Sequence, residues 1–258
     1  MSLGNMFSSG IKFINKLLWI ILIPIALDLW QLFAHQYFFK TDYSPIKRLF
    51  SLKVGIISSP PSINFILEDF PPVLFQYNSN GLKGIIHEVS LFNVFFMLTI
   101  ILITSFIHSG YLSVLGVKAE GKISIKDFFI MGNRNWFKFF ILHLIQYIPV
   151  ILILFAKEFI VLGFIFVLFF YVQYSIVVDA GKISENFIKG MSFLFSNLGL
   201  TIKMALYFGF IFSLLSILIY LLTSFSTIGI VLDIIIIAYF GAAVNRAVLQ
   251  IYTEKSRG

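Results

Sequence analysis

Long apolar runs alternate with short polar segments along this chain, and the lengths of the runs predict helices that cross a membrane. About 20 consecutive apolar residues are enough to span the hydrocarbon core of a bilayer. Six runs of roughly this length contain almost no Asp, Glu, Lys or Arg. We therefore expect an all-α polytopic membrane bundle with about six transmembrane helices, at residues 17–34, 90–117, 139–156, 159–178, 198–222 and 228–248.

The last two of these spans come from one hydrophobic run that is too long for a single crossing. Residues 204–232 carry no charge, and the apolar pattern then continues to Val248. A cluster of small polar residues at positions 223–226 suits a turn, so we place a break there. The even number of spans depends on this break, and so does a cytoplasmic C-terminus.

The overall composition agrees with a membrane protein. Hydrophobic residues make up 59% of the chain and charged residues 12%, whereas soluble domains contain about 45–50% and about 25%. A soluble protein with this balance could not cover its surface with polar groups, so the bilayer must serve as the solvent. The chain has no cysteine, which excludes disulfides, thiolate metal sites and cysteine nucleophiles.

The positive charges orient the spans. The net charge of +7 raises the question of nucleic acid. However, Lys and Arg lie beside the hydrophobic runs and form no basic stripe, so we expect no nucleic-acid partner. No A-x-A-like cleavage site follows the first run, which favours an uncleaved anchor in the cell membrane. We expect both termini in the cytoplasm and residues 1–16 at the inner interface. In that orientation only six of the 19 basic residues lie outside: Lys40, Lys47, Arg48, Lys53, Lys83 and Lys157.

The longest connection, residues 35–88, lies outside the membrane in this topology. Its SPIKRLFSLK segment places apolar residues against Lys47, Arg48 and Lys53, which suits a short helix in the interface. Two Pro-Pro pairs then bracket an apolar stretch that is too short to span. The many aromatic residues favour an extracytoplasmic cap resting on the outer leaflet over a disordered loop.

A tetrapeptide recurs at equivalent places in the predicted topology. Gly121-Lys-Ile-Ser returns as Gly181-Lys-Ile-Ser, each time after a span and before a short amphipathic segment. Glycine can end the preceding helix, and Ser124 or Ser184 can cap the following one. The matching surroundings favour a duplicated helical hairpin over a chance match. The two cytoplasmic elbows comprise Gly121, Lys122, Ser124, Gly181, Lys182 and Ser184.

The second elbow resembles bacterial integral membrane families of unknown function. The order Gln173-Tyr-Ser-Ile-Val-Val-Asp-Ala-Gly181, followed by a short helix over residues 186–195, is similar to theirs. These families include the membrane domain that accompanies some glycerophosphodiester phosphodiesterases. The resemblance covers about residues 90–250, and the acidic residue and glycine that end the fourth span are matched by Asp179 and Gly181. It implies the architecture but no catalytic residue, because the phosphodiesterase chemistry belongs to a separate domain.

Two carboxylates fall inside predicted spans, where ionisable side chains are costly and are candidate functional groups. Asp28 and Asp233 lie at similar depths near the outer ends of their spans. Two close carboxylates in such a layer would share a proton or bind a cation. We expect instead that each carboxylate reaches the interface or forms hydrogen bonds separately.

A second polar layer lies nearer the cytoplasmic face. His108 and His143 have similar depths, and a proton relay or a lipid head-group site would use such residues. Lone histidines in membrane helices more often form interhelical hydrogen bonds. Metal binding is less favoured, because no carboxylate or third histidine stands at ligand spacing. Further polar residues expected near this layer are Gln146, Gln173, Asn245 and Arg246.

The sequence contains no G-x-S-x-G, H-E-x-x-H or P-loop pattern, so we assign no catalytic residue, metal or cofactor. The leading hypothesis is a non-enzymatic, permease-like or transport-associated subunit. Its elbows would dock a cytoplasmic partner such as an ATPase, an analogy of position with the coupling helices of ABC transporters. A structural or lipid-organising protein is the alternative, and an intramembrane lipid-modifying enzyme is less favoured. Membrane lipids are the expected partners, while the substrate and a homo-oligomer stay open.

Overall fold

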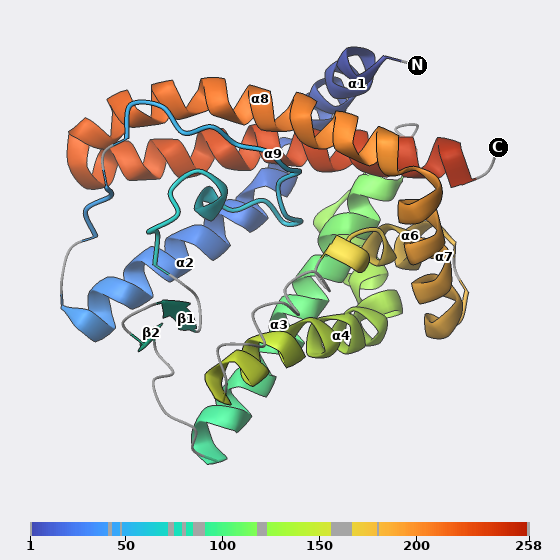
Figure 1. The fold of residues 1–258 in the computed structure, drawn as a ribbon, viewed down its shortest axis with the longest axis horizontal. Coiled ribbons are helices and arrows are strands. Elements are labelled where there is room, and N and C mark those ends of the chain that lie inside the picture. Colours follow the sequence, from blue (N-terminus) through green and yellow to red (C-terminus); the bar gives the residue numbers. More distant parts are fainter. Residues whose placement is uncertain are drawn as a thin grey trace. The chain divides into compact units, whose positions relative to one another are not determined.

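The computed structural model describes residues 2–40, 43–46, 48–71, 75–78, 81–84, 91–117, 123–155, 167–179 and 181–256. Within these residues the regular structure is helical apart from one short antiparallel hairpin (Figure 1). The elements, in chain order, are α1 (Leu3–Lys16), η1 (Leu18–Ile21), α2 (Leu22–Phe39), η2 (Ile63–Phe65), β1 (Phe75–Asn78), β2 (Gly81–Gly84), α3 (Leu91–Gly116), α4 (Ile125–Phe155), α6 (Val172–Val178), α7 (Ile183–Ser196), α8 (Leu198–Leu222), η4 (Thr223–Phe225) and α9 (Ser226–Ser256).

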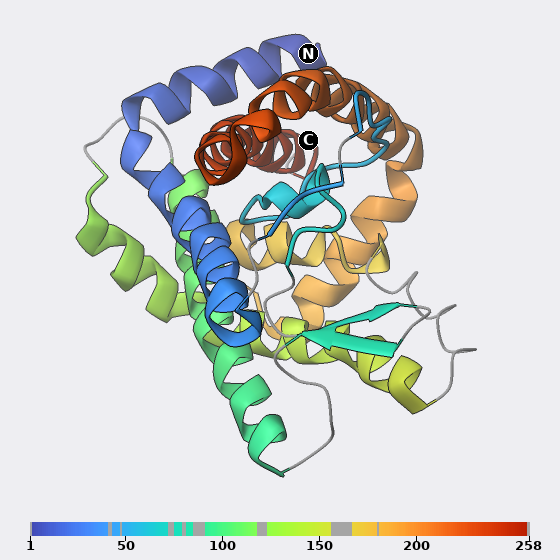
Figure 2. The same cartoon turned by 90° about the vertical axis from the view of Figure 1, so that its left-hand side faces the viewer.

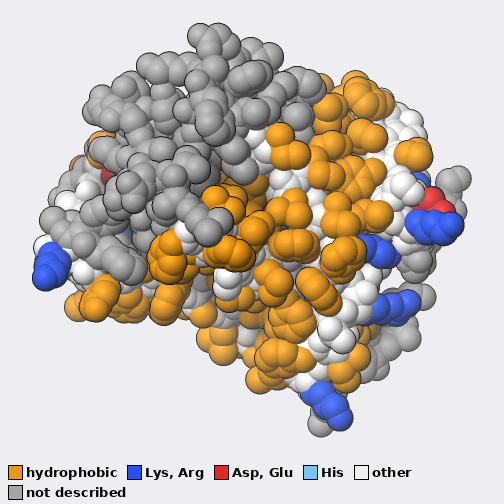
Figure 3. All heavy atoms as spheres, turned by 90° about the horizontal axis from the view of Figure 1, so that it is seen from below, with side chains coloured by type: hydrophobic (Ala, Val, Ile, Leu, Met, Phe, Trp, Pro, Cys, Tyr) orange, Lys and Arg blue, Asp and Glu red, His pale blue; other side chains and the backbone are white. Residues whose placement is uncertain are grey.

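Three helical stretches are long and apolar enough to cross a membrane. They are Leu18–Tyr37, Val94–Gly116 and Leu198–Ser256, and the last contains both α8 and α9. Large apolar side chains point outward from these helices; Trp30 and Phe210, for example, are 68% and 58% exposed. Hydrophobic side chains accordingly form a broad surface in Figure 3, with Lys and Arg at its edges. An apolar surface of this extent indicates membrane association.

The six predicted spans have different outcomes. The first coincides with η1 and α2, the second with α3, and the last two with α8 and α9. The third occupies the C-terminal half of α4, which runs without interruption from Ile125. In the fourth, residues 159–166 lie outside the described residues, and the remainder includes α6. The count of six spans therefore stays a prediction.

The chain reverses between α8 and α9 inside the segment where the sequence predicts a break. A single 3-10 turn, Thr223–Phe225, separates the two helices, and Ser226 has a positive φ of 57°. Gly229 lies so close to the Leu222 carbonyl that a side chain there would overlap it. Small residues thus permit the tight reversal, after which α9 runs opposite to α8 (Figure 1).

Residue contacts divide the chain into two compact units, whereas the sequence analysis treats it as one domain. Unit 1 consists of Met1–Val89 and Leu200–Val248, and unit 2 of Ser90–Gly199 and Leu249–Gly258. Unit 1 therefore combines α1 and α2 with most of α8 and α9. Unit 2 contains α3, α4, α6 and α7 with the end of α9.

Helix α1 covers the predicted interfacial N-terminus and packs against α9 in unit 1. The Ser2 side chain caps it by accepting the Asn5 N–H at 3.3 Å. Its buried residues, Phe13 among them, face the protein. Gly10 permits a close approach, because a Cβ at this position would overlap the Ala243 carbonyl. Figure 2 shows α1, in dark blue, beside the red ribbon of α9.

In unit 2, α3 packs closely along α4. The Ser109 hydroxyl donates a hydrogen bond across the helix pair to the Gly132 carbonyl at 2.9 Å. A Cβ built on Gly132 would lie 3.3 Å from the Gly110 Cα, so small residues set the spacing of the two helices. A cluster of aromatic rings fills the space between α6, α7 and the end of α9, and it comprises Tyr171, Tyr174, Phe193 and Tyr252.

The two elbows of the predicted repeat fold differently. Gly121 and Lys122 lie outside the described residues. In the first copy, α4 begins directly after Ser124, whose N–H donates to Asp127 at 2.7 Å. In the second copy, Lys182 occupies the N-cap position and Ser184 lies inside α7, so the cap predicted at Ser184 is wrong. The reason is Glu185, which accepts the Lys182 N–H three residues earlier in the chain.

The segments that follow the elbows also differ. Helix α4 continues for 31 residues to Phe155. Helix α7 ends at Ser196, where the Asn197 side chain donates to the Phe193 carbonyl at 3.1 Å before α8 begins. The duplicated hairpin therefore stays a prediction. Gly181 itself is held by Lys138, whose ammonium group donates to its carbonyl at 2.7 Å.

The approach of α1 to α9 can be tested by substitution. We expect Gly10→Ala to lower the melting temperature in detergent, because overpacking of this kind costs about 1–3 kcal/mol. Gly4→Ala is the matched control in the same helix, since its new Cβ would meet only the Tyr207 hydroxyl at 3.4 Å. Gly4→Ala should be neutral or stabilising by up to about 1 kcal/mol through helix propensity. Equal melting temperatures for the two variants would contradict the packing.

Candidate functional site

Residues 48–70, hereafter the internal segment, pack among the helices of unit 1. Their only regular structure is the 3-10 turn η2. Even so, Ile57 and Ile63 are fully buried, and Lys53 is only 7% exposed. In Figure 1 the segment, coloured blue to cyan, passes along α8 and turns back toward α2.

The first part of the internal segment runs along α8 with its backbone extended. The Ser51 N–H donates to the Ser216 hydroxyl at 3.0 Å, and the Lys53 N–H donates to the Ser213 hydroxyl at 2.8 Å. The Gly55 N–H then donates to the Ala205 carbonyl at 3.0 Å. These acceptors extend over about 16 Å of helix at 1.5 Å per residue. The segment therefore follows α8 over a little less than half of its length.

A glycine in α8 makes this contact possible. A Cβ on Gly209 would overlap the Lys53 carbonyl, so only glycine admits the extended backbone at this distance. Ser213 donates its own hydroxyl proton to the Gly209 carbonyl at 2.9 Å and is left free to accept from Lys53. One face of α8 is thus shaped and polarised to hold the internal segment.

The second part of the internal segment contacts α9 and α2. The Asn245 side chain donates to the Ser58 carbonyl at 3.0 Å, and Pro61 lies against Gly241. On α2, Asp28 accepts the Ser62 hydroxyl at 2.7 Å and the Ile63 N–H at 2.8 Å. The segment is therefore bound to three helices by side chains that supply its backbone with partners.

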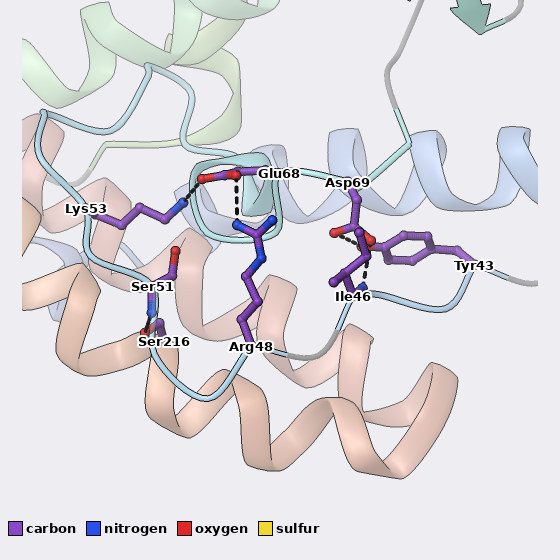
Figure 4. Close-up of polar contacts among 8 residues, drawn as sticks. All are labelled: Tyr43, Ile46, Arg48, Ser51, Lys53, Glu68, Asp69 and Ser216. Atoms are coloured by element: carbon purple, nitrogen blue, oxygen red, sulfur yellow. Dashed lines mark hydrogen bonds and ion pairs between the residues drawn. The ribbon is translucent and has the colours of Figure 1, made fainter. Parts of the chain in front are cut away.

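A group of ion pairs and hydrogen bonds joins the two ends of the internal segment (Figure 4). The Lys53 ammonium contacts the Glu68 carboxylate at 2.7 Å, and Arg48 contacts the same carboxylate at 3.2 Å. Next to them, Asp69 accepts the Ile46 N–H at 2.8 Å and the Tyr43 hydroxyl at 3.2 Å. Lys53 is thereby paired although its side chain is only 8% exposed.

These contacts affect the ionisation of the groups in the loop. The hydrogen bond and charge of Lys53, with a smaller contribution from Arg48, lower the pKa of Glu68. Burial raises the pKa of the Tyr43 hydroxyl, and the neighbouring charge of Asp69 raises it further. Glu68 therefore stays ionised to lower pH in the folded chain than in the unfolded chain.

The predicted interfacial helix at SPIKRLFSLK is wrong, whereas the outer cap stays a prediction. The described residues of that stretch, 44–46 and 48–53, form no helix. Their N–H groups are bound elsewhere, by Asp69 in the case of Ile46 and by Ser216 and Ser213 in the case of Ser51 and Lys53. Side-chain acceptors have replaced the acceptors that a helix would supply.

The two predicted carboxylates have different surroundings. Asp28 is 1% exposed and accepts the two hydrogen bonds from the internal segment. Asp233 is fully buried in α9, and neither of its oxygens has a hydrogen-bond partner in the described part of the chain. Within that part, no hydrogen bond joins Asp28 to Asp233.

The structure brings the two predicted histidines together in unit 2. His108 Nδ1 lies 3.0 Å from His143 Nε2, and the Ser105 hydroxyl lies 2.8 Å from His143 Nδ1. The Gln173 side chain interacts with His108 from α6, and Gln146 is half-buried on α4. The expected interhelical bond between lone histidines is therefore present, between α3 and α4.

The other members of the predicted polar layer belong to unit 1. Asn245 binds the Ser58 carbonyl, and the Arg246 guanidinium lies 4.3 Å from the centre of the Phe13 ring. Their contacts hold the internal segment and α1 instead of a histidine site. Lys53 and the serines of α8 are not predicted as site residues, because an external connection gives no reason to expect their contact.

Comparison with known proteins gives no assignment: no protein-family model, curated protein or solved structure matches this chain. The resemblance to bacterial membrane families therefore stays a prediction. Among the described residues, no three His, Asp or Glu side chains gather closely enough to hold a metal ion. The chemically notable feature of unit 1 is that buried ionisable groups, Lys53 and Asp28, lie in or against a non-helical segment.

The ion pair predicts how stability depends on pH. Because the pKa of Glu68 is lowered on folding, the pairing stabilises the fold fully above the unfolded pKa of about 4.3 and is lost as pH falls through the lower, folded value. We therefore expect Glu68→Gln to melt below the wild type at pH 7, with the difference shrinking below about pH 4.3.

The measurement is thermal unfolding in detergent across this pH range. Glu254→Gln is the control, because it removes an exposed carboxylate of α9 that forms no ion pair in the described residues and accepts a hydrogen bond from Gln250. A difference between Glu68→Gln and wild type that stays constant down to acid pH would contradict the assigned pairing.

Proposed function

We propose that this chain is a permease-like or transport-associated protein of the cell membrane, with six spans and both termini in the cytoplasm. The observation that carries the proposal is the extended backbone of residues 51–55 alongside α8, a helix of membrane-spanning length. Backbone that is not helical is tolerated at membrane depth only where protein surrounds it or where it lines a cavity. Transporters use such segments to form their substrate and ion sites.

The depth of the internal segment supports this reading. Ala205, which binds the Gly55 N–H, lies about 26 Å along α8 from the outer end at Leu222. The hydrocarbon core is about 30 Å thick. In the proposed topology the internal segment is thus re-entrant: it enters from the outside and reaches the level of the cytoplasmic end of α8.

The buried ionisable groups of unit 1 also favour transport. Lys53, Asp28 and Asp233 are each at most 7% exposed. Charged residues inside a bilayer are rare because they are expensive, and they commonly mark the pathway of an ion or polar substrate. A small polar solute or ion is therefore the class of substrate that the proposed permease would carry.

The docking of a cytoplasmic partner rests on α7. This helix follows the second elbow, and Ile188, Ser192 and Phe195 on one of its faces are exposed. An ATPase is the partner that a transport-associated subunit would need. The same apolar face could instead lie in the lipid head-group region, and this observation favours a lipid-organising protein as the second candidate.

Cysteine accessibility tests the topology without background labelling, since the chain has no native cysteine. We expect a membrane-impermeant thiol reagent outside intact cells to label Ser44→Cys and Ser224→Cys. Ser256→Cys should react only after the membrane is opened. Ser58→Cys, although exposed in the structure, should resist labelling from outside because it lies at the inner turn of the re-entrant segment. Labelling of Ser58→Cys at the rate of Ser44→Cys would show an external loop.

Flux measurements test the function itself. In liposomes containing the purified chain, we expect faster osmotic swelling with glycerol or faster proton movement reported by pyranine than in empty liposomes. Replacing Asp28 and Asp233 together by Asn should reduce that flux at least tenfold. Asp127→Asn is the control, because Asp127 lies at the start of α4 outside the predicted spans.

A chain without flux of its own should instead co-purify with an ATPase from its native membrane, which would support the transport-associated form of the proposal. Flux by the purified chain alone would eliminate the ATPase-docking form and support the permease. Absence of both flux and a co-purifying ATPase would reject the proposal in favour of a lipid-organising role.

A further inference from the structure

We infer that His108 and His143 form a buried site that binds one proton, with His108 Nε2 as the atom that takes it up. The site lies in unit 2 and uses none of the residues of the internal segment. Its existence does not depend on transport; only its use as a coupling site rests on the proposed function.

The geometry begins with three side chains in a row. The Ser105 hydroxyl lies 2.8 Å from His143 Nδ1, and His143 Nε2 lies 3.0 Å from His108 Nδ1. The two imidazole rings are nearly parallel, with an interplanar angle of 24°. Phe139 packs against the His108 ring at 4.7 Å between ring centroids. The row joins α3 to α4 and is fixed in orientation by packing.

The hydrogen bonds determine which nitrogen carries each proton. The Ser105 hydroxyl donates its single proton to the Ile101 carbonyl, so it can only accept from His143 Nδ1. His143 Nδ1 is therefore protonated, and in the neutral ring its Nε2 must be an acceptor. His108 Nδ1 must then be the donor between the two rings. Ser105 thus sets the tautomer of both histidines.

This order leaves His108 Nε2 as a base without a proton. His108 is 7% exposed, and its Nε2 makes no hydrogen bond in the described residues. Buried polar atoms without partners are uncommon and indicate a role or an unseen ligand. Gln173 interacts with His108 from α6. The neighbouring Tyr174 hydroxyl is likewise buried without a hydrogen bond in the described residues.

Proton uptake at this atom breaks no hydrogen bond within the row. A hydronium ion gives its proton to the lone pair of His108 Nε2 and leaves as water. The positive charge is then shared through the bond from His108 Nδ1 to His143 Nε2, because hydrogen bonds from a charged donor are about twice as strong as neutral ones. Since His143 cannot accept a second charge next to the first, the pair takes up one proton.

Few other ionisable groups come near the pair. Helix α3 carries no Asp, Glu, Lys or Arg. On α4, Lys138 is bound to the Gly181 carbonyl, and Tyr147 is an uncharged phenol one turn beyond His143. On the α6 side, Tyr174 is uncharged, and Asp179 accepts from Ser175 and Tyr252. The histidine pair is therefore the base that a proton entering between these helices would meet.

Nitrogen-15 NMR of labelled histidines in detergent tests the site directly. The chain has four histidines, and His108→Gln and His143→Gln assign the two signals of interest. At neutral pH we expect His108 and His143 both to carry the proton on Nδ1. On acidification the two rings should change together in one step, while the protein remains folded by circular dichroism.

Ser105→Ala should mix the tautomers of both histidines. Ser109→Ala is the matched control, because Ser109 is equally buried on α3 but its hydroxyl donates to the Gly132 carbonyl and forms no hydrogen bond with a histidine in the described residues. Protonation of His143 on Nε2 at neutral pH, or two independent titrations, would overturn the inference. Absence of both liposome flux and a co-purifying ATPase, with these NMR results intact, would remove the transport proposal and leave the proton site standing.

Discussion

The hydroxyl groups of Ser213 and Ser216 hold an extended backbone against a helix, and the rest of unit 1 depends on this contact. A helix satisfies its own N–H and C=O groups, but an extended segment among apolar helices has to find partners elsewhere. Each of the two hydroxyls serves twice, donating to a carbonyl of α8 and accepting from the internal segment. The N–H groups of the segment thereby bond to side chains instead of water, and the segment is fixed in position along α8.

The other features of unit 1 follow from that position. Once the Lys53 backbone lies on Gly209, its side chain is buried and needs a carboxylate, which Glu68 provides from the returning part of the segment. The returning segment in turn supplies two hydrogen-bond donors to Asp28, whose buried oxygens would otherwise lack these partners. The same contacts thus offset both the cost of burying polar backbone and the cost of burying the Lys53 charge.

The sequence predicts the helices well because the length of a hydrophobic run is a local property. The reversal at residues 223–226 is also local, since small polar residues sit there together. The internal segment is different, because Ser51 and Ser216 are 165 positions apart. A serine can bond to many kinds of partner, so neither residue indicates that it contacts the other. A weak signal exists: Gly209, Ser213 and Ser216 recur every three or four residues, which marks one small and polar face of α8. The similar depths of His108 and His143 in their predicted spans correctly indicate that they lie together. Depth alone does not say which way a side chain points around its helix, so the contact of Asn245 with Ser58 could not be predicted.

Asp233 stands apart from the other buried groups. Asp28 has two donors, Lys53 has a carboxylate, and the histidines have each other, whereas both oxygens of Asp233 lack a partner in the described residues. A carboxylate in apolar surroundings cannot remain ionised without compensation, so it must be neutral or bind a cation. A fold selected only for stability would replace it with an apolar residue at little cost. Because the group lies in a helix of spanning length, transport of an ion would give Asp233 a role that a lipid-organising scaffold does not require.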